Sequence, residues 1–277
     1  MWVKLNLLLR KHTPRFHAFL KKATLRLRNS GVYALPIPVY TGSELFLLHP
    51  SFLTHDQTEP HVQSYFRSVL RRGDVVLDIG ANYGFHTMLL SRLVGSTGRV
   101  IAFEPSPENL KLLRYHCRTN FMRNVQICTN AVGDVANSSV DFVLIDGGKH
   151  SSNSFTVADE YPYILEQQKT KTVIREKTVI RVPMTTIDMT CKKSNVKPTL
   201  IKIDVEGAEF FVLKGAEQTI TKYRPSIVIG IHPFWMPKDQ STRDIIQFLR
   251  AHNYEIKNFD GCLVDELKYG DYIATPR

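Results

Sequence analysis

The chain has 277 residues, of which 43% are hydrophobic and 22% are charged, a composition typical of a globular protein. Disordered, collagen-like and coiled-coil proteins are therefore excluded. The net charge of +10 is unevenly placed, because residues 1–43 hold eight Lys or Arg and no acid, leaving 28 basic against 26 acidic residues over 44–277. We expect a basic, amphipathic N-terminal extension over 1–43, followed by one nearly neutral domain over 44–277.

The extension begins with apolar residues, and Arg10-Lys11 follow them, which is the reverse of the order in a secretory signal. No run of 18 apolar residues occurs, so no membrane-spanning helix is predicted. Three roles fit residues 1–30: a helix lying on an anionic membrane surface, an organelle-targeting peptide, or a solvated helix that packs on the domain.

The four cysteines form no CxxC pair and no Cys/His cluster, which argues against a zinc site. We expect free and mostly buried thiols in a reducing compartment. The predicted location is the cytoplasm, with membrane association or organelle import as alternatives. The cysteines are Cys117, Cys128, Cys191 and Cys262.

Beyond residue 43, strand-like and helix-like stretches alternate, which indicates an α/β fold with a doubly wound, mostly parallel sheet. Buried strands are expected at 75–77, 99–103, 125–131, 200–203 and 227–231, with a closing pair at 254–259 and 272–274. Helices are expected at 59–71, 85–94, 207–222 and 241–252, and between Ser106, a capping residue, and Asn120.

Residues 135–199 interrupt this alternation where a single crossover helix would suffice. Two β-rich runs lie there, 140–145 and 173–182, and the sequence KTVIR occurs at both 171–175 and 177–181. We interpret the region as an inserted hairpin or sheet extension with a polar loop at 146–154. Placed beside the carboxyl ends of the strands, it would shape a substrate pocket.

The first strand–helix turn, in the segment VVLDIGANYG at 75–84, predicts a ligand site, because open α/β sheets bind ligands there. Gly80 and Gly84 allow close approach of backbone and ligand. Asp78 and Asn82 supply a carboxylate and an amide that suit a cationic group, and the turn is not the GxGxxG pattern of pyrophosphate binding. Glu104, directly after the second strand, is placed to accept the ribose hydroxyls of a nucleoside.

The segments DIGANYG, FEPSPEN, LIKIDVEGAEFFVLKGA, RPSIVIGIHP and YIATP together resemble the FkbM family of S-adenosylmethionine-dependent methyltransferases over about residues 58–277. The resemblance implies a class I, Rossmann-like methyltransferase fold with an antiparallel last strand. It also implies O-methylation of a hydroxyl on a sugar, glycolipid or natural product. The stretch 202–209, KIDVEGAE, is its most specific part.

The resemblance also implies roles for individual residues. Asp78, Gly80, Asn82 and Gly84 would form the loop at the methionine end of S-adenosylmethionine, Glu104 would bind its ribose, and Asn130 and Ala131 would border its adenine. The segment 186–188 resembles a short family motif before the fourth strand. One departure stands out, because many members have an acid two places before the histidine that ends the fifth strand, whereas this chain has Gly230.

Methyl transfer to oxygen needs an aligned acceptor and a group that removes the hydroxyl proton. We predict that Asp204 orients the cofactor or the acceptor and that His232 is the general base, with Glu206 as the second candidate base. The aromatic run 233–236 suits stacking on a sugar. These three residues also suit magnesium, but their convergence does not follow from the sequence, and no metal is assigned. Weaker candidates near the expected pocket are His86, Asp134 and His150.

Two other functions compete with this prediction. A nicotinamide-dependent oxidoreductase would need a GxGxxG turn and would lack the KIDVEGAE stretch, so the sequence opposes it. An RNA- or protein-modifying methyltransferase recruited through the basic extension is the alternative, but a body with a net charge of +2 offers phosphates little attraction. We therefore expect a small-molecule or glycan acceptor and no nucleic acid partner.

Overall fold

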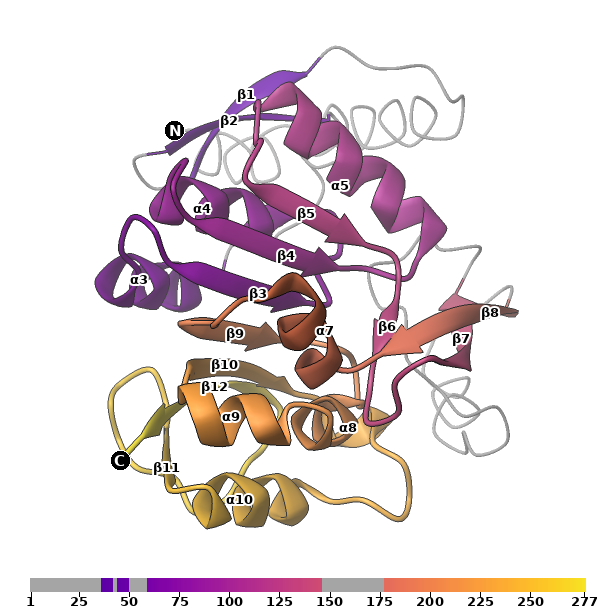
Figure 1. Ribbon diagram of the computed structural model, residues 1–277, viewed down its shortest axis with the longest axis vertical. Coiled ribbons are helices and arrows are strands. Elements are labelled where there is room, and N and C mark those ends of the chain that lie inside the picture. Colours follow the sequence, from indigo (N-terminus) through magenta and orange to yellow (C-terminus); the bar gives the residue numbers. More distant parts are fainter. Residues whose placement is uncertain (1–35, 42–43, 50–58, 146–176) are drawn as a thin grey trace, which may run out of the picture.

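The computed structural model describes residues 36–41, 44–49, 59–145 and 177–277. At its centre lies a seven-stranded sheet (Figure 1), most of whose inner strands are short, apolar and buried on both faces. Its strands are β3 (Val75–Ile79), β4 (Arg99–Phe103), β5 (Val125–Cys128), β9 (Leu200–Ile203), β10 (Ser226–Ile231), β11 (Tyr254–Lys257) and β12 (Gly270–Pro276).

The strand order is β11-β12-β10-β9-β3-β4-β5. Strands β10, β9, β3, β4 and β5 are parallel to their neighbours in this order, whereas β12 is antiparallel to both β10 and β11. The predicted fold class, a doubly wound and mostly parallel sheet with an antiparallel last strand, is confirmed. The winding direction reverses between β3 and β9, and ligands bind outside the carboxyl ends of strands at such a point.

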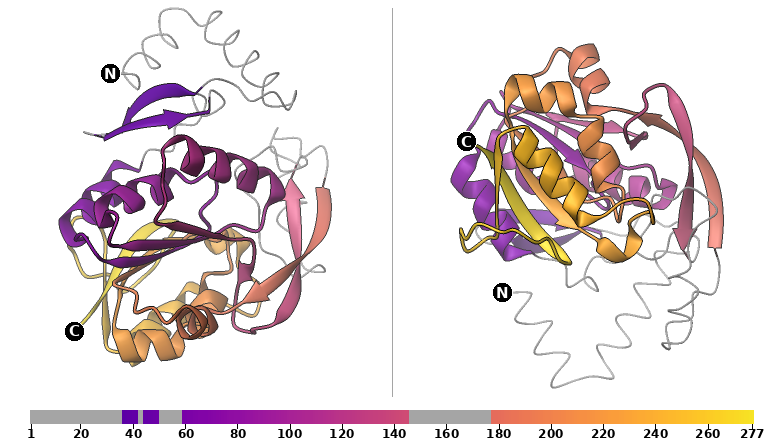
Figure 2. Two further views of the ribbon diagram at one scale, coloured as in Figure 1. Left: turned by 45° about the horizontal axis from the view of Figure 1, so that its top comes forward. Right: turned by 90° about the horizontal axis from the view of Figure 1, so that it is seen from below.

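Helices cover both faces of the sheet (Figures 1 and 2). On one face, Phe66 and Met88 are buried in a cluster with β3 and β4, and on the other Ile187, Val212 and Ile245 pack on β9 and β10. The first face carries α3 (Pro60–Val69), α4 (Phe85–Val94) and α5 (Pro107–Thr119), and the second carries α7 (Ile187–Ser194), α8 (Glu209–Lys214), α9 (Glu217–Tyr223) and α10 (Thr242–Ala251).

Capping residues and the spacing of apolar residues predicted most helix ends correctly. The Ser106 hydroxyl caps α5 by accepting from the Asn109 backbone N–H at 3.5 Å, and Asn120 ends the helix. The single helix expected over 207–222 is instead two helices, α8 and α9. They separate at Gly215, where the chain approaches the Gly133 carbonyl so closely that a Cβ would lie 1.9 Å from its oxygen.

The inserted region forms a second, three-stranded sheet. Strands β7 (Ser138–Ile145) and β8 (Lys177–Thr185) pair antiparallel, which confirms the expected hairpin. The short strand β6 (Ala131–Val132) pairs with β8 rather than extending β5, so the third predicted strand is divided between the two sheets. The polar loop at 146–154 and the first KTVIR copy lie outside the described residues.

A hairpin of β1 (Ile37–Thr41) and β2 (Glu44–Leu48) crosses the boundary that the sequence placed at residue 43. Phe46 and Leu48 are fully buried among side chains of α3 and α4, and the Arg92 guanidinium lies 4.5 Å from the Phe46 ring. The folded domain therefore begins before residue 44. Residues 1–30, for which membrane contact was predicted, lie outside the described part.

Phe46→Ala tests whether the hairpin belongs to the domain core. The substitution should lower the free energy of unfolding by about 3–5 kcal/mol, because it leaves a cavity beside α3 and α4. Leu45→Ala, on the neighbouring residue with 38% exposure, should cost less than about 1 kcal/mol. Urea denaturation measures both, and equal small losses would mean that the hairpin contributes no core contact.

The described cysteines are free, as predicted. Cys117 and Cys191 are buried, Cys128 is half-buried and Cys262 is exposed. Within the described ranges, no helix has the length and apolar character needed to cross a membrane.

Candidate active site

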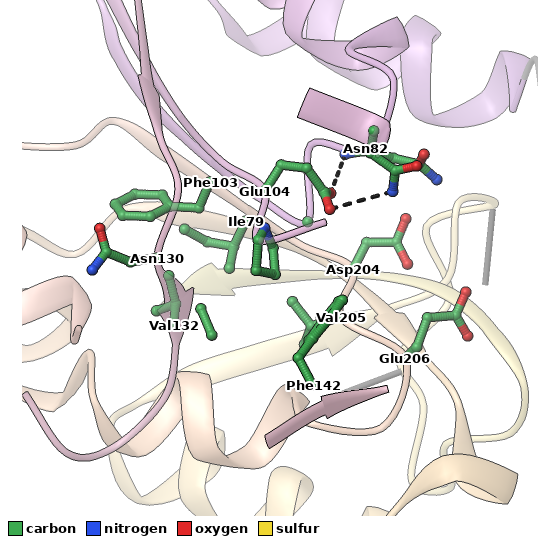
Figure 3. Close-up of a pocket in the computed structure, with 14 residues that line it drawn as sticks. Ile79, Asn82, Phe103, Glu104, Asn130, Val132, Phe142, Asp204, Val205 and Glu206 are labelled. Carbon is green, nitrogen blue, oxygen red and sulfur yellow. Dashed lines mark hydrogen bonds between the residues drawn. The ribbon is translucent and has the colours of Figure 1, made fainter. Parts of the chain in front are cut away.

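A pocket lies at the carboxyl ends of β3, β4 and β9, at the point where the winding reverses (Figure 3). It brings together residues that are far apart in the chain. Seven of the predicted site residues line it: Gly80, Asn82, Glu104, Asn130, Ala131, Asp204 and Glu206. The insertion contributes Phe142 from β7 to this pocket, and its role in shaping a substrate pocket stays a prediction.

Glu104 directly follows β4, and its buried carboxylate forms part of the pocket wall (Figure 3). One oxygen accepts from the Asn82 backbone N–H at 2.8 Å, and the other accepts from the Ser106 N–H at 2.8 Å and the Asn109 amide at 3.3 Å. Burial raises the pKa of Glu104 to about 7, against the effect of these donors. A carboxylate offers about four acceptor sites, so capacity for a ligand hydroxyl remains.

Asp78, near the end of β3, has no exposed surface and accepts from the Thr87 hydroxyl at 2.6 Å. Its other oxygen lies 3.7 Å from the Lys202 ammonium and has no hydrogen-bond partner among the described residues. Burial raises the pKa of Asp78, and the Lys202 charge opposes the increase. Asp78 is thus a buried acid with unused acceptor capacity just beneath the turn.

Lys202, on β9, lies between Asp78 and Asp204. Its ammonium donates to Asp204 at 3.1 Å, as residues two apart on a strand lie on the same side of it. Burial disfavours the charged form of Lys202, but Asp204, Asp78 and Glu59 outweigh it and raise its pKa. Burial likewise opposes ionisation of Asp204, but Lys202 and His232 lower its pKa.

The turn after β3 depends on Gly80, whose φ is +79° and whose added Cβ would lie 1.8 Å from the Asp204 carbonyl oxygen. Only glycine lets this turn approach the end of β9 so closely. Gly84 has another function, because a Cβ there would meet Leu113 of α5 at 2.5 Å. It provides space for helix packing and is not among the residues that line the pocket.

Beyond the pocket, Asp204, Glu206 and His232 converge, although His232 itself does not line the pocket. The His232 Nε2 lies 3.7 Å from Asp204 Oδ1 and 3.8 Å from Glu206 Oε2. Glu206 has a left-handed backbone with φ +53°, a conformation rare outside glycine that often marks functional loops. The candidate catalytic residues are therefore neighbours at the edge of the predicted cofactor site.

Glu209 orients His232 from behind. Its fully buried carboxylate lies 2.8 Å from His232 Nδ1 and accepts from the Gly207 N–H at 2.9 Å. Burial alone would lower the pKa of His232, but Glu209, Glu206 and Asp204 outweigh it and raise that pKa to about 9. Burial raises the pKa of Glu206 to about 7.

A sequence profile described as the methyltransferase FkbM domain matches residues 78–256, more than half of the chain. The chain belongs to the FkbM methyltransferase family. Its match to the 31-O-demethyl-FK506 methyltransferase FkbM of Streptomyces tacrolimicus is 28% identical and covers 84% of this chain and 89% of that protein.

Two further matches each cover half or less of the matched protein. The protein-L-isoaspartate O-methyltransferase of Ignicoccus hospitalis is 29% identical over 110 residues, which are 39% of this chain and 45% of that enzyme. The crystal structure of methyltransferase FkbM from Methylobacillus flagellatus is 18% identical with a TM-score of 0.44. That match covers 77% of this chain and half of the solved one.

FkbM-family methyltransferases use S-adenosylmethionine, and the pocket fits it in three respects. Glu104 would accept its ribose hydroxyls, and the turn after β3, with Asn82 in it and the buried Asp78 beneath it, would hold its methionine end. Asn130 and Ala131, where the chain leaves β5, would border adenine. The buried, unused oxygen of Asp78 is the observation that best suits a cationic amino group. When bound, the cofactor supplies an electrophilic methyl group.

Gly230 stands where many family members have an acid, and an acid from another strand lies beside it. Strand β12 places Asp271 opposite Gly230, and a Cβ at 230 would lie 3.4 Å from Asp271 Oδ1 and 3.2 Å from Asp204 Oδ1. A carboxylate from the antiparallel strand thus lies beside the space left by the glycine. No signal in the sequence pointed to Asp271, because pairing of distant strands sets its position.

The other candidate residues play smaller parts. His86 is buried in α4 with its pKa lowered to about 3 by burial, and its Nε2 lies 3.4 Å from Glu59. Asp134 pairs with Lys214 at 2.7 Å away from the cluster, and His150 lies outside the described residues. Tyr269, which the sequence analysis missed, contacts His232 edge to face at 5.6 Å between ring centroids and is 67% exposed.

Proposed function

We propose that this FkbM-family methyltransferase transfers a methyl group to a hydroxyl oxygen of a small-molecule or glycan acceptor. The observation that carries the proposal is the cluster of Asp204, Glu206 and His232 at the end of the cofactor pocket. Methyl transfer to oxygen needs polar groups at the end of the cofactor pocket that can activate the acceptor hydroxyl. The Streptomyces relative, whose name specifies a 31-O-demethyl substrate, supports oxygen as the acceptor atom.

The reaction removes one proton and forms one bond. The acceptor oxygen loses its proton and bonds to the methyl carbon, while the carbon–sulfur bond breaks and its electron pair stays on sulfur as a neutral thioether. Attack must be in line. The side chains of this protein must therefore hold the oxygen beside the pocket and lower the cost of its deprotonation.

The surroundings of His232 weaken its predicted role as a free general base. Three carboxylates face the ring, one at Nδ1 and two at Nε2. With its pKa raised to about 9, the imidazole holds a proton at neutral pH and has no free lone pair for a hydroxyl proton. We therefore assign deprotonation to the cluster as a unit.

Aromatic side chains beside the cluster suit a sugar or another ring-shaped acceptor. Phe234, in the 3-10 helix η3 (Pro233–Trp235) after β10, is 55% exposed, and Tyr269 stands beside the His232 ring. Exposed aromatic faces next to polar groups suit a ligand that is apolar on one face and hydroxylated at its rim. This arrangement favours a glycan or polyol acceptor over a nucleic acid.

A labelled-methyl assay tests the proposal. The full chain, incubated with methyl-labelled S-adenosylmethionine, should label at least one member of a panel of glycans, glycolipids and hydroxylated metabolites. The product should resist mild alkali, because it is an ether. Asp204→Asn should reduce transfer by at least about 100-fold, with cofactor binding confirmed by calorimetry.

Other outcomes of the same assay would contradict an O-methylated small molecule. Label that mild alkali releases as methanol would indicate a carboxyl methyl ester, and label on RNA or protein would support the alternative of a macromolecular substrate. The role of residues 1–30 at an anionic membrane stays a prediction, which vesicle co-sedimentation of the full chain and of a 31–277 variant would test.

A further inference from the structure

The arrangement of the Asp204, Glu206 and His232 side chains is that of a cation site. One ligand atom from each of the three residues lies within 4.8 Å of the other two. Two ligands on one cation at about 2.1 Å stand roughly 3–4 Å apart. The two measured separations from Nε2, 3.7 and 3.8 Å, are within that range.

These separations are longer than hydrogen bonds, so no hydrogen bond joins Nε2 to either carboxylate. Asp204 divides its oxygens, with Oδ2 on the Lys202 ammonium at 3.1 Å and Oδ1 facing His232. Lys202 therefore neutralises the other side of this carboxylate. Among the ion pairs of the described residues, His232 is the partner of both Asp204 Oδ1 and Glu206 Oε2.

His232 is held as a metal-ligating histidine is held. Its residue surface is only 8% exposed, and Nδ1 is fixed by the buried Glu209 carboxylate at 2.8 Å. That contact leaves Nε2 directed at the two carboxylates, without a hydrogen bond to any residue that the structure describes. A carboxylate behind a histidine, fixing its tautomer and ring plane, is the usual outer support of a metal ligand.

The backbone holds the three residues in this arrangement. Gly207, with φ +101°, lets the loop after β9 touch the chain after β10, because a Cβ there would lie 2.2 Å from the Trp235 carbonyl oxygen. This contact brings Glu206 beside His232. The ligand atoms thus come from two adjacent strand ends joined by a close backbone contact, and not from one flexible loop.

We propose that Asp204 Oδ1, Glu206 Oε2 and His232 Nε2 bind one divalent metal ion. Two carboxylates and one imidazole suit Mn²⁺ and other first-row transition ions better than Ca²⁺, which takes oxygen ligands alone. Three protein ligands leave coordination positions open for an acceptor. This inference rests on the proposed function only for its catalytic consequence, because the site itself is defined by this chain.

The ion explains how the cluster deprotonates an alcohol. A hydroxyl oxygen bound to a divalent cation loses its proton to water far more readily than a free one. Asp204, Glu206 and His232 would hold the ion, and the ion would stabilise the negative charge on the acceptor oxygen during its attack on the methyl carbon. His232 then acts as a neutral ligand, which removes the difficulty of using a protonated imidazole as a base.

Manganese binding to the full chain tests the site without any acceptor. Chelator-treated protein should bind one Mn²⁺, seen by calorimetry and by loss of the free-ion paramagnetic resonance signal. Electron spin echo modulation from a directly bound nitrogen should appear, and His232→Gln should abolish it. Glu209→Gln should weaken Mn²⁺ binding by about 10–100-fold, as loss of an outer support does.

Asp134→Asn is the matched control, because Asp134 is a half-buried acid outside the cluster that pairs with Lys214 at 2.7 Å. It should leave Mn²⁺ affinity unchanged. Unfolding midpoints and cofactor binding of each variant show whether the protein is folded. Folded wild-type protein that binds neither Mn²⁺ nor Zn²⁺, or that binds Mn²⁺ without a nitrogen signal, would overturn the proposal.

The two proposals fail in different ways. Full methyl transfer to a hydroxyl in excess chelator would refute the metal site and leave O-methylation intact. Stoichiometric Mn²⁺ binding that depends on His232, together with a carboxyl or macromolecular product, would refute the proposed acceptor and leave the metal site intact.

Discussion

Glu104→Gln is expected to weaken S-adenosylmethionine binding by about 100-fold. The side chain projects from the end of β4 into the pocket wall, where hydrogen bonds to an ionised group contribute about 1.5–3 kcal/mol each. The amide keeps the size of the side chain but loses its charge and turns one acceptor into a donor. Isothermal calorimetry with the cofactor or its demethylated product measures the loss.

Glu108→Gln is the matched control, because Glu108 lies one turn away in α5 and its ion pair with Lys111 is exposed. Its affinity should equal that of the wild type. A Glu104→Gln protein that remains folded and binds the cofactor with unchanged affinity would remove the ribose role from Glu104 and with it the assigned orientation of the cofactor.

The same carboxylate makes cofactor binding depend on pH. Burial raises the pKa of Glu104 to about 7 in the free protein, whereas ribose hydroxyls donate best to its ionised form. Below pH 7 the ionised fraction falls, so affinity should drop about tenfold from pH 8 to pH 6. The Glu104→Gln variant should bind weakly with no such dependence.

The free energy of unfolding should change with pH in the direction opposite to the change in cofactor affinity. A raised pKa means that the folded protein holds the Glu104 proton more tightly than the unfolded chain does between pH 4.5 and about 7. The contribution of this group to stability is therefore complete below pH 4.5 and is lost as pH rises through 7. Glu104→Gln should remove this part of the pH dependence of unfolding.

The fold followed from the sequence because its signals are local. Buried parallel strands are short apolar runs, and Ser106 and Asn120 bound a helix through contacts within one turn. The structure confirmed β4 at its predicted residues and α4 likewise. Helix α7 was missed, because the β-rich runs before it obscured the single crossover helix that the alternation required.

The cofactor pocket was predictable for a related reason, since the ends of parallel strands meet at one edge of the sheet. The partners of His232 were not predictable in the same way. Glu209 is the first residue of α8, where an acid commonly stabilises the helix N-terminus, yet its buried carboxylate is turned onto the imidazole. Asp271 reaches Gly230 only through the pairing of β10 with β12, a contact between distant segments.

Lys202→Met should lower the free energy of unfolding by about 3–5 kcal/mol, because the buried ammonium lies between two carboxylates. The Lys202 ammonium lies 3.7 Å from Asp78 and 3.1 Å from Asp204. Lys202 and Asp78 are both buried, so water cannot replace the lost positive charge. Methionine fills the volume of the chain but leaves both acids without their cation. Urea denaturation of the full chain measures the loss.

Two comparison variants separate lost charge from lost packing. Lys214→Met breaks the half-exposed pair with Asp134 and should cost less than about 1 kcal/mol. Adding Asp78→Asn to Lys202→Met removes one of the two stranded charges, so the double variant should regain about 1–2 kcal/mol relative to Lys202→Met alone. If Asp78→Asn instead lowered the free energy of unfolding further, Lys202 would stabilise β9 by packing alone. The electrostatic link between the turn after β3 and Asp204 would then be refuted.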